Sequence, residues 1–473
     1  MARELAAAER GAVYGRMGTT TQEFGTLASW LVEVLNVLTG NLDREGGAMF
    51  TRAAAGQKNS AGAGGSGKGV RFGRWASRVR GLPETFGELP VAALAEEIDT
   101  PGEGQVRALV TLAGNPLVST PNAERLARAV EGLDLVISID IYVNETTRHA
   151  DVILPAPEPL EKAHYDLALY QLAVRNVANY SPAVFESEVP AEWRTLLRLA
   201  ALIAGQGPDA DVDAFDSMVI ATLIQRELAD PGSRLAGRDA DELLRELEPR
   251  TGPERMLDFM LRAGPYGLTL DQLEQNPHGI DLGPLEPRLP DVLRTSSGRI
   301  ELAPEPILAD AERLRAALER ERNGGLVLIG RRQLRSNNSW MHNLPALVKG
   351  KDRCTLLVHP DDADRLGLSD GGRALVRSAA GQIEAPVELT DEIMPGVVSL
   401  PHGWGHDEEG MRLGVASAHA GVNSNVLADE TAVDPLSGNA VLNGIPVELE
   451  PAGGAQPSSN GGAYETAPRA SSV

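Results

Sequence analysis

The chain has 473 residues, of which 42% are hydrophobic and 23% charged, so it is long enough for about three domains with cores of ordinary size. Its 44 basic and 66 acidic residues give a formal net charge of −22, which disfavours nucleic acid and anionic membranes as partners. Cys354 is the only cysteine, so no disulfide framework and no cysteine-ligated cluster can form within the chain. Cys354 is the first residue of an apolar run, so its thiol is expected to be buried in the core. No stretch approaches the roughly 18–20 consecutive apolar residues that a membrane span needs.

The first ten residues have the pattern of a charged amphipathic helix. They lack the apolar centre of a signal peptide, so we expect a cytoplasmic protein. From Phe24 to Thr39 apolar residues recur at helical spacing, and Gly40 and Asn41 end that helix. Residues 51–74 hold seven glycines. This segment is either a surface loop or a loop that faces a cofactor.

An alternating strand and helix pattern follows. Residues 106–112, 133–139 and 150–154 are predicted strands, and 121–130 is a predicted helix with Thr120 as its N-cap. The second strand is almost continuously apolar, which is typical of a buried strand in a parallel sheet. Ligands of such sheets bind at the carboxyl ends of the strands.

The pattern of predicted secondary structure changes in the second half of the chain. Residues 191–205, 214–248 and 310–322 are predicted to be helical, and 263–307, rich in Pro and Gly, to be irregular. From Leu326 short strands follow one another and predict a compact β-barrel. These strands are 326–329, 355–358, 374–378, 382–389, 396–400 and 445–449. We therefore expect an α/β region over 1–205, a connecting region over 206–325, a barrel over 326–452 and a disordered tail over 453–473.

Five motifs in a fixed order make a more specific pattern than any one of them. They are Leu38-Thr-Gly-Asn-Leu-Asp-Arg-Glu-Gly-Gly47, Leu112-Ala-Gly-Asn-Pro-Leu-Val-Ser119, Ser138-Ile-Asp-Ile-Tyr-Val-Asn-Glu-Thr-Thr147, His149-Ala-Asp-Val-Ile-Leu-Pro155 and, at the start of the barrel region, Leu328-Ile-Gly-Arg331. This series resembles that of the molybdopterin-dependent oxidoreductases of the dimethyl sulfoxide reductase family, over about residues 10–205 and 325–450.

The resemblance implies a fold, a cofactor and an activity. The fold is α/β: a partial doubly wound parallel sheet followed by a C-terminal double-psi β-barrel. The cofactor is molybdenum or tungsten held by two molybdopterin guanine dinucleotides. The activity is oxo or hydride transfer on a small substrate. The implied partner is an electron-transfer subunit, which electrons reach through a 4Fe–4S cluster.

Candidate cofactor-binding residues in the α/β region follow the first two strands. Gly114, Asn115 and Pro116 are expected beside a pyrophosphate, which binds backbone N–H groups at strand ends and helix starts. Asp140 is assigned to guanine, because a carboxylate can accept hydrogen bonds from the N1–H and the 2-amino group of that base. Alternatively, Asp140 is a turn residue or a helix cap. Glu145 and Thr146 orient the nucleotide or, alternatively, cap a short helix.

The barrel region contributes a dense polar run and two later segments. The run holds Arg331, Arg332, Arg335, Ser336, Asn337, Asn338, Ser339, Trp340 and His342. Asn, Ser and His can bind the edges of a pterin and Arg can neutralise phosphate, whereas the alternative is an exposed polar loop. His402, Trp404 and His406 are expected to pack against the cofactor rather than to form a metal site, because no carboxylate accompanies them. Asn423 and Asn425 are expected in the same shell.

The sequence also departs from the family pattern. The family's cluster cysteines and metal ligand would precede residue 1, so we assign no catalytic residue and no metal ligand. We expect a fragment, a truncated gene product or one half of a split enzyme, with an unpaired apolar edge on its sheet. A non-catalytic cofactor-binding remnant is the alternative. Residues 24–30 lack the Arg of formate dehydrogenases, which weakens that assignment, and the substrate is not predicted.

Overall fold

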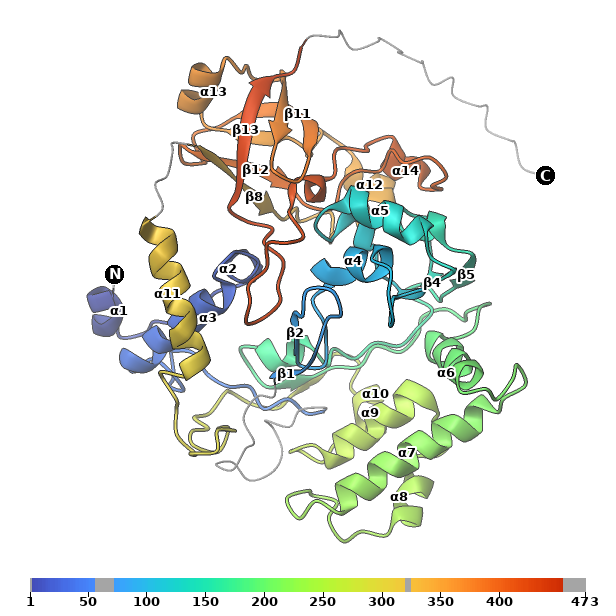
Figure 1. The fold of residues 1–473 in the computed structure, drawn as a ribbon. Coiled ribbons are helices and arrows are strands. Elements are labelled where there is room, and N and C mark those ends of the chain that lie inside the picture. The colour runs from blue at the N-terminus through green and yellow to red at the C-terminus, as the bar shows by residue number, and fades with distance from the viewer. Residues whose placement is uncertain (1, 56–71, 320–324, 454–473) are drawn as a thin grey trace, which may run out of the picture.

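The structure, a computed structural model, describes residues 2–55, 72–319 and 325–453. Figure 1 shows three parts: an α/β part in the middle, helices α6–α10 in green at the bottom, and a β-barrel in orange and red at the top. Most of the glycine-rich segment 51–74 and nearly all of the predicted tail lie outside the described residues. No described helix is long and apolar enough to cross a membrane.

The α/β part is built on a three-stranded parallel sheet. Its strands are β3 (Ala108–Leu112), β4 (Leu135–Asp140) and β5 (Val152–Pro155), with β4 in the centre. Helices α4 (Leu94–Asp99) and α5 (Ala123–Glu131) cover one face with a cluster of buried apolar side chains. The strands and the crossover helix agree with the sequence prediction.

Two local details of this sheet differ from the prediction. Helix α5 begins at Ala123 and its N-cap is Asn122, not Thr120: Asn122 adopts the left-handed conformation (φ 48°) and its side chain accepts from the Arg125 N–H. Asn tolerates that conformation, whereas β-branched Thr does not. The second strand, β4, is also not buried along its whole length, since Leu135 at its start is 39% exposed, and the edge strand β3 exposes Val110 and Leu112.

The N-terminal segment packs against a helix from the middle of the chain. It contains α1 (Ala2–Ala7), α2 (Met17–Thr20), α3 (Gly25–Leu38), and the small hairpin β1 (Phe72–Ala76) and β2 (Pro83–Thr85). Helix α3 matches the predicted helix. It lies beside α11 (Glu305–Glu319), which begins five residues earlier than predicted (Figure 1). The Arg313 guanidinium of α11 stacks on the Phe24 ring, 4.1 Å from its centroid.

Residues 192–274 form a helical unit of their own, which begins inside the predicted α/β region (1–205) and extends into the predicted connecting region (206–325). Its helices are α6 (Glu192–Ile203), α7 (Val212–Leu228), α8 (Ala240–Glu246), α9 (Gly252–Ala263) and α10 (Leu270–Glu274). A core that includes Ile220, Ile224 and Leu243 joins α7, α8 and α9. Helices α9 and α10 were not predicted. The signal for α10 is local: Thr269 and Gln272 form a capping box, which fixes its first turn.

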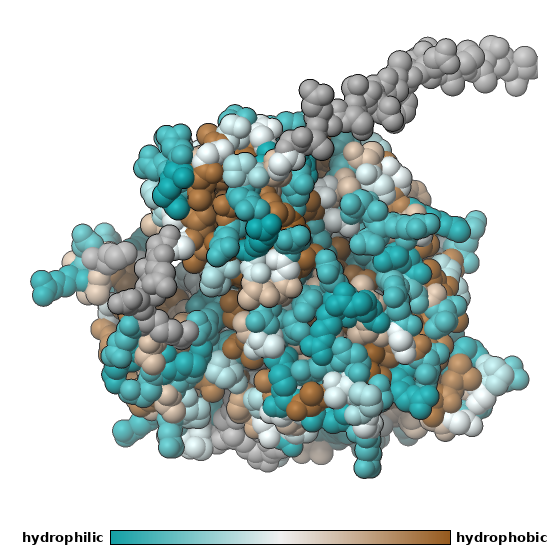
Figure 2. Space-filling view, turned by 45° about the horizontal axis from the view of Figure 1, so that its top comes forward, coloured by the Kyte–Doolittle hydropathy of each residue, from teal (hydrophilic) through white to brown (hydrophobic). Residues whose placement is uncertain are grey.

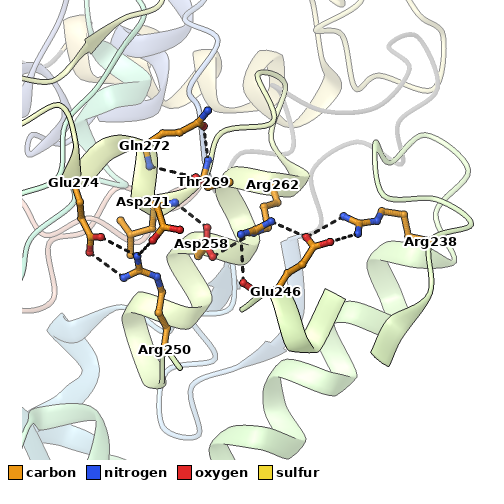
Figure 3. Close-up of polar contacts among 10 residues, drawn as sticks. Arg238, Glu246, Arg250, Asp258, Arg262, Thr269, Asp271, Gln272 and Glu274 are labelled. Carbon is orange, nitrogen blue, oxygen red and sulfur yellow. Dashed lines mark hydrogen bonds and ion pairs between the residues drawn. The ribbon is translucent and has the colours of Figure 1, made fainter. Parts of the chain in front are cut away.

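Arginines tie the ends of these helices together, as Figure 3 shows. Arg262 of α9 bonds Glu246 of α8 (2.7 Å) and Asp258 of its own helix (3.2 Å). Arg250 bonds Glu274 of α10 at 2.9 Å. Pairs that are exposed to solvent contribute at most about 1 kcal/mol each, whereas the buried Asp258 carboxylate needs its Arg262 partner.

The C-terminal part is a closed six-stranded barrel. Around the barrel the order is β10 (Arg373–Arg377), β11 (Gln382–Leu389), β9 (Leu356–Val358), β12 (Val397–Pro401), β8 (Leu326–Arg331) and β13 (Ile445–Pro451), with parallel and antiparallel pairs. Its interior holds a cluster of fully buried aliphatic side chains. The predicted strands are confirmed, and the short helix α13 (Pro360–Leu366) follows β9. In Figure 2 the surface turned to the viewer is largely hydrophilic, as the acidic composition predicts.

Short elements complete the chain. They are the helices α12 (Pro345–Val348) and α14 (Gly414–Ser417), the strands β6 (Val177–Ala178) and β7 (Ile280–Asp281), and the 3-10 turns η1 (Val91–Ala93), η2 (Pro116–Val118), η3 (Thr147–His149), η4 (Leu169–Leu172), η5 (Trp340–Asn343) and η6 (Ser424–Leu427). Several of them lie where the barrel meets the carboxyl ends of the parallel strands.

Candidate functional site

The loops that follow β3 and β4 are joined by side-chain hydrogen bonds. The Asn115 amide donates to a Glu145 carboxylate oxygen at 2.6 Å, and the Thr146 hydroxyl donates to the Asn115 side-chain oxygen at 2.7 Å. The Leu117 N–H in turn donates to the Thr146 oxygen. Glu145 and Thr146 are almost completely buried. These three predicted site residues therefore form one rigid polar group at the strand ends.

Asp140 at the end of β4 has the turn role that sequence reasoning gave as its alternative. One carboxylate oxygen accepts the N–H groups of Ile141 and Tyr142, and the other accepts the Asn144 amide. Burial raises the pKa of Asp140, although these bonds lower it. The first oxygen already accepts two hydrogen bonds, so only the second retains a free lone pair with which the carboxylate can accept from a ligand.

The barrel reaches across to the same loops through two asparagines. The Asn423 amide donates to the Leu117 carbonyl at 2.8 Å, and the Asn425 amide donates to the Val118 carbonyl at 2.7 Å. A backbone bond from the Asn122 N–H to the Ala428 carbonyl lies beside them. Both asparagines were predicted to contact the cofactor, and the structure shows that they also hold the two parts of the molecule together.

A buried row of ionisable side chains crosses the same boundary. His406 Nδ1 lies 2.6 Å from Glu145 Oε1, and His406 Nε2 lies 2.8 Å from His342 Nδ1. The His342 ring packs on Trp404 with 4.0 Å between ring centroids. Burial alone would raise the pKa of Glu145, but hydrogen bonds from His406 and Asn115 lower it below the ordinary value. Burial, reinforced by His406, lowers the pKa of His342 to about 4.

The polar run after β8 divides into residues that hold the barrel and residues that are open to ligands. Arg331 donates to the carbonyls of Ser399 (2.7 Å), Thr355 (2.7 Å) and Arg353 (3.3 Å), so its guanidinium ties β8 to β9 and β12. Burial lowers its pKa. Arg332 is exposed and bonds Asn338. Arg331 is therefore occupied within the barrel, whereas Arg332 and Arg335 are exposed.

Asn337 and Asn338 adopt left-handed backbone angles (φ 40° and 63°), which turn this loop back toward the barrel. Tight packing then fixes its position. A Cβ at Gly403 would meet the Asn338 carbonyl oxygen at 2.3 Å. Glycine is therefore required at 403, and the motif Pro401-His-Gly-Trp-Gly-His406 holds the polar loop in place.

Three cavities adjoin this region: two of about 270 Å³ each, described below, and one of about 430 Å³ lined by Leu117, Glu145, Gly405 and Asn423 among others. The first, here called the interdomain cavity, lies between α2, the loop after β3 and the barrel. Its polar lining includes Ser119, Arg332, Asn338, His402, Ser424, Asn425 and Asn443. Burial, and then Arg332, lower the pKa of His402 to about 4. Ser119, Ser424 and Asn443 were not singled out in the sequence, because they are ordinary loop residues whose placement depends on the packing of two parts.

The second, here called the barrel cavity, is lined by Arg335, Ser336, His342 and Trp404 together with Cys354, Lys351, Arg353 and Arg373. Cys354 is buried, and burial raises the pKa of its thiol to about 11. Of the predicted site residues, those that border none of the three cavities are Gly114, Asn115, Pro116, Asp140, Thr146, Arg331, Asn337, Ser339, Trp340 and His406. Among the described residues, no three His, Cys, Asp or Glu side chains are grouped so that they could hold a metal ion.

A parallel sheet and a closed barrel that present Asn, Ser, His and Arg to a shared boundary define an α/β protein with a polar interdomain cavity. Comparison with known families makes this more specific. Residues 1–177 match the sequence model of the family described as molybdopterin oxidoreductase, and residues 326–446 match that of the molydopterin dinucleotide binding domain. The chain belongs to the molybdopterin oxidoreductase family, that of dimethyl sulfoxide reductase, and its C-terminal barrel is the dinucleotide-binding domain.

Individual relatives match over different lengths. The dimethyl sulfoxide/trimethylamine N-oxide reductase of Rhodobacter capsulatus is 23% identical over 358 residues, which cover 67% of this chain and 39% of that protein. One of the subunits of the tetrathionate reductase of Salmonella typhimurium is 34% identical over 124 residues, or 23% of this chain and 12% of that protein. The structure of acetylene hydratase from Pelobacter acetylenicus aligns with a TM-score of 0.54 and 19% identity, over 77% of this chain and 47% of that one.

This last likeness concerns the fold alone. In each of these matches the chain spans less than half of the relative's length. The family and the barrel domain establish a molybdopterin cofactor, whereas the reaction and the form of the cofactor belong to the proposal that follows.

Proposed function

We propose that this chain is the cofactor-binding part of a molybdopterin-dependent catalytic subunit, which transfers an oxo group or a hydride to or from a small substrate. One observation carries the proposal. The loops at the strand ends and the loops of the barrel meet in a polar interdomain cavity, and the two family matches fall on the two parts that form it. A cofactor with several polar groups can be held between two such surfaces.

The lining suits one end of a bis-molybdopterin guanine dinucleotide. A pterin is flat and carries donors and acceptors along its edge, and the side-chain amides of Asn338, Asn425 and Asn443 offer both kinds of group. Arg332 can neutralise a phosphate at the open side. We assign the pyrophosphate of one dinucleotide to the loop of Gly114, Asn115 and Pro116, and its guanine to Asp140.

When bound, the molybdenum or tungsten centre supplies the redox chemistry. The residues of this chain bind and orient the organic part of the cofactor. Since Cys354 is the only cysteine, we propose that the 4Fe–4S cluster comes from polypeptide outside this sequence, as does the protein ligand to the metal. An electron-transfer subunit is the proposed partner, and several relatives are themselves named as subunits.

The test is the cofactor content of the purified chain. Elemental analysis for molybdenum and tungsten, together with fluorescence of the oxidised pterin, should detect bound pterin. Arg332→Ala should lower the pterin content. Arg377→Ala is the matched control, because Arg377 lies on the outside of the barrel, paired with Glu450. A chain that folds but carries no pterin when produced with cofactor would overturn the proposal. Pterin bound with no turnover by the chain would favour the non-catalytic remnant or the split enzyme.

A further inference from the structure

The barrel cavity is separate from the cavity to which the cofactor is assigned. It shares no lining residue with the interdomain cavity. Its walls come from the loop after β8, from α12, from the segment that leads into β9, from the start of β10 and from residues 418–422. Its volume of about 270 Å³ is below the roughly 300–1,000 Å³ of pockets that hold drug-sized ligands, so any occupant is small.

The lining of the barrel cavity is positively charged, although the chain as a whole is acidic. The chain has 44 basic and 66 acidic residues, whereas this cavity is lined by four Arg and Lys side chains and one carboxylate, that of Asp352. The four cations are Arg335, Lys351, Arg353 and Arg373. The Asp352 side chain is 83% exposed, so water solvates its charge. A hollow lined by charges of one sign attracts ions of the other sign.

Two of the four cations lack a carboxylate partner. The Arg353 guanidinium donates only to main-chain carbonyls, those of residues 347–349 at the end of α12. These bonds fix its position and leave its charge uncompensated. Arg335 is exposed and has no hydrogen bond or ion pair with any residue that the structure describes. Two uncompensated guanidinium groups therefore line one small cavity.

The other two cations are only weakly occupied. Lys351 pairs with Glu388 at 3.0 Å, and Arg373 pairs with Glu384. Neither glutamate lines the cavity, and both pairs are largely exposed to solvent. Because exposed pairs of this kind contribute little, both cations remain able to contact a ligand at the rim.

Main-chain donors lie in the same lining. Within the described part of the chain, the N–H groups of Ala420 and Gly421 donate to no acceptor. Gly421 has a left-handed backbone (φ 63°), and a Cβ on it would meet Trp404 at 2.3 Å and Cys354 at 2.8 Å. Glycine is therefore required where this loop packs against the cavity wall. Guanidinium groups and backbone N–H groups together are the donors that oxyanions use in proteins.

We propose that the barrel cavity binds a small divalent oxyanion with the size and charge of sulfate or hydrogen phosphate. Arg335 and Arg353 neutralise its two charges, and the N–H groups of residues 420 and 421 donate to its oxygens. Lys351 and Arg373 attract it at the rim. Because the two cavities have no lining residue in common, this oxyanion is a free solute and not a phosphate of the cofactor. The proposal therefore does not depend on the proposed function.

Isothermal titration calorimetry of the full chain with sodium sulfate tests the site. In a buffer without phosphate we expect saturable binding of one sulfate per chain. Arg335→Gln and Arg353→Gln each remove hydrogen bonds to a charged group and should weaken that binding roughly 10- to 150-fold. Arg353→Gln also removes bonds to the end of α12. Arg335→Gln removes no contact within the described chain, so it decides the question even if the Arg353 variant fails to fold.

Arg377→Gln is the matched control, because Arg377 lies on the outside of the barrel, paired with Glu450. It should leave sulfate binding unchanged. Heats that do not saturate, or that sodium chloride reproduces at the same ionic strength, would show only general screening and would overturn the site. Loss of sulfate binding in Arg332→Ala would also overturn it, since Arg332 lines the interdomain cavity instead.

The same titration separates this site from the cofactor site. Chain loaded with pterin should bind sulfate as tightly as chain without it. Sulfate binding by the pterin-free chain alone would show that a cofactor phosphate fills the barrel cavity, which contradicts a separate site. A chain that binds sulfate and never carries pterin contradicts only the proposed function.

Discussion

Asn425 offers a sharp test of how the barrel is held on the sheet. Its side chain is 3% exposed, and its amide donates to the Val118 carbonyl at 2.7 Å and to Asn423 at 3.1 Å. Asn425→Ala leaves the buried Val118 carbonyl without a partner, which costs about 1–3 kcal/mol. Since about 1.4 kcal/mol corresponds to a tenfold change in an equilibrium constant, local opening should become roughly 5- to 160-fold more frequent.

Hydrogen exchange followed by mass spectrometry measures how often this boundary opens locally. The informative amide is that of Asn122, which donates across the boundary to the Ala428 carbonyl. The exchange rate of this amide should increase roughly 5- to 160-fold, whereas the exchange rates of peptides from α7 should stay the same. Asn276→Ala is the control, because Asn276 is exposed and bonds only within its own helical unit. If Asn425→Ala leaves exchange at 115–122 unchanged, the barrel is held by other contacts and the reasoning from the unpaired carbonyl is refuted.

Three further outcomes are expected. Leu356→Ala, at a fully buried barrel position, should lower the free energy of unfolding by about 2–5 kcal/mol in urea denaturation, whereas Leu334→Ala, 98% exposed, should change it by less than about 0.5 kcal/mol. The Cys354 thiol, with a pKa of about 11, should react slowly with maleimide at pH 8 and rapidly in denaturant; equal rates would contradict its burial. The pKa of His402 is about 4 in the folded chain and about 6.5 in the unfolded chain. Between pH 4 and pH 6.5 the unfolded chain therefore binds more protons, so the free energy of unfolding falls as the pH drops through this range. His402→Gln should reduce that slope by about 1.4 kcal/mol per pH unit, and an unchanged slope would show that His402 titrates normally.

The fold was largely predictable from the sequence, because each element of the barrel and of the parallel sheet carries its own local signal. Alternating or continuous apolar runs bounded by Gly and Asp mark all six barrel strands. Helix α9 was not predicted, because its apolar residues lie in a stretch, beginning near Pro253, that is rich in charged residues. Its stability comes from Leu257 and Leu261 packing against residues distant in the chain, a signal that no local window contains.

The sequence alone did not give the structural roles of the candidate site residues. Arg331 and Arg332 are neighbours in one polar run, and the sequence treats them alike. The structure engages Arg331 with three carbonyls inside the barrel and leaves Arg332 exposed at the interdomain cavity. Which of two adjacent arginines is buried depends on the strand's alternation and on where β8 ends, and a shift of one residue would exchange them.

The same reasoning explains why Glu145 and His406 were not connected in advance. They lie 261 residues apart, and each has an ordinary local explanation, one as a helix cap and the other as a loop residue. Burial makes the pairing informative: a carboxylate that is 2% exposed requires partners, and here these come from both parts of the molecule. The docking of the barrel on the sheet therefore depends on buried polar side chains from both parts, and the experiment on Asn425 tests one of them.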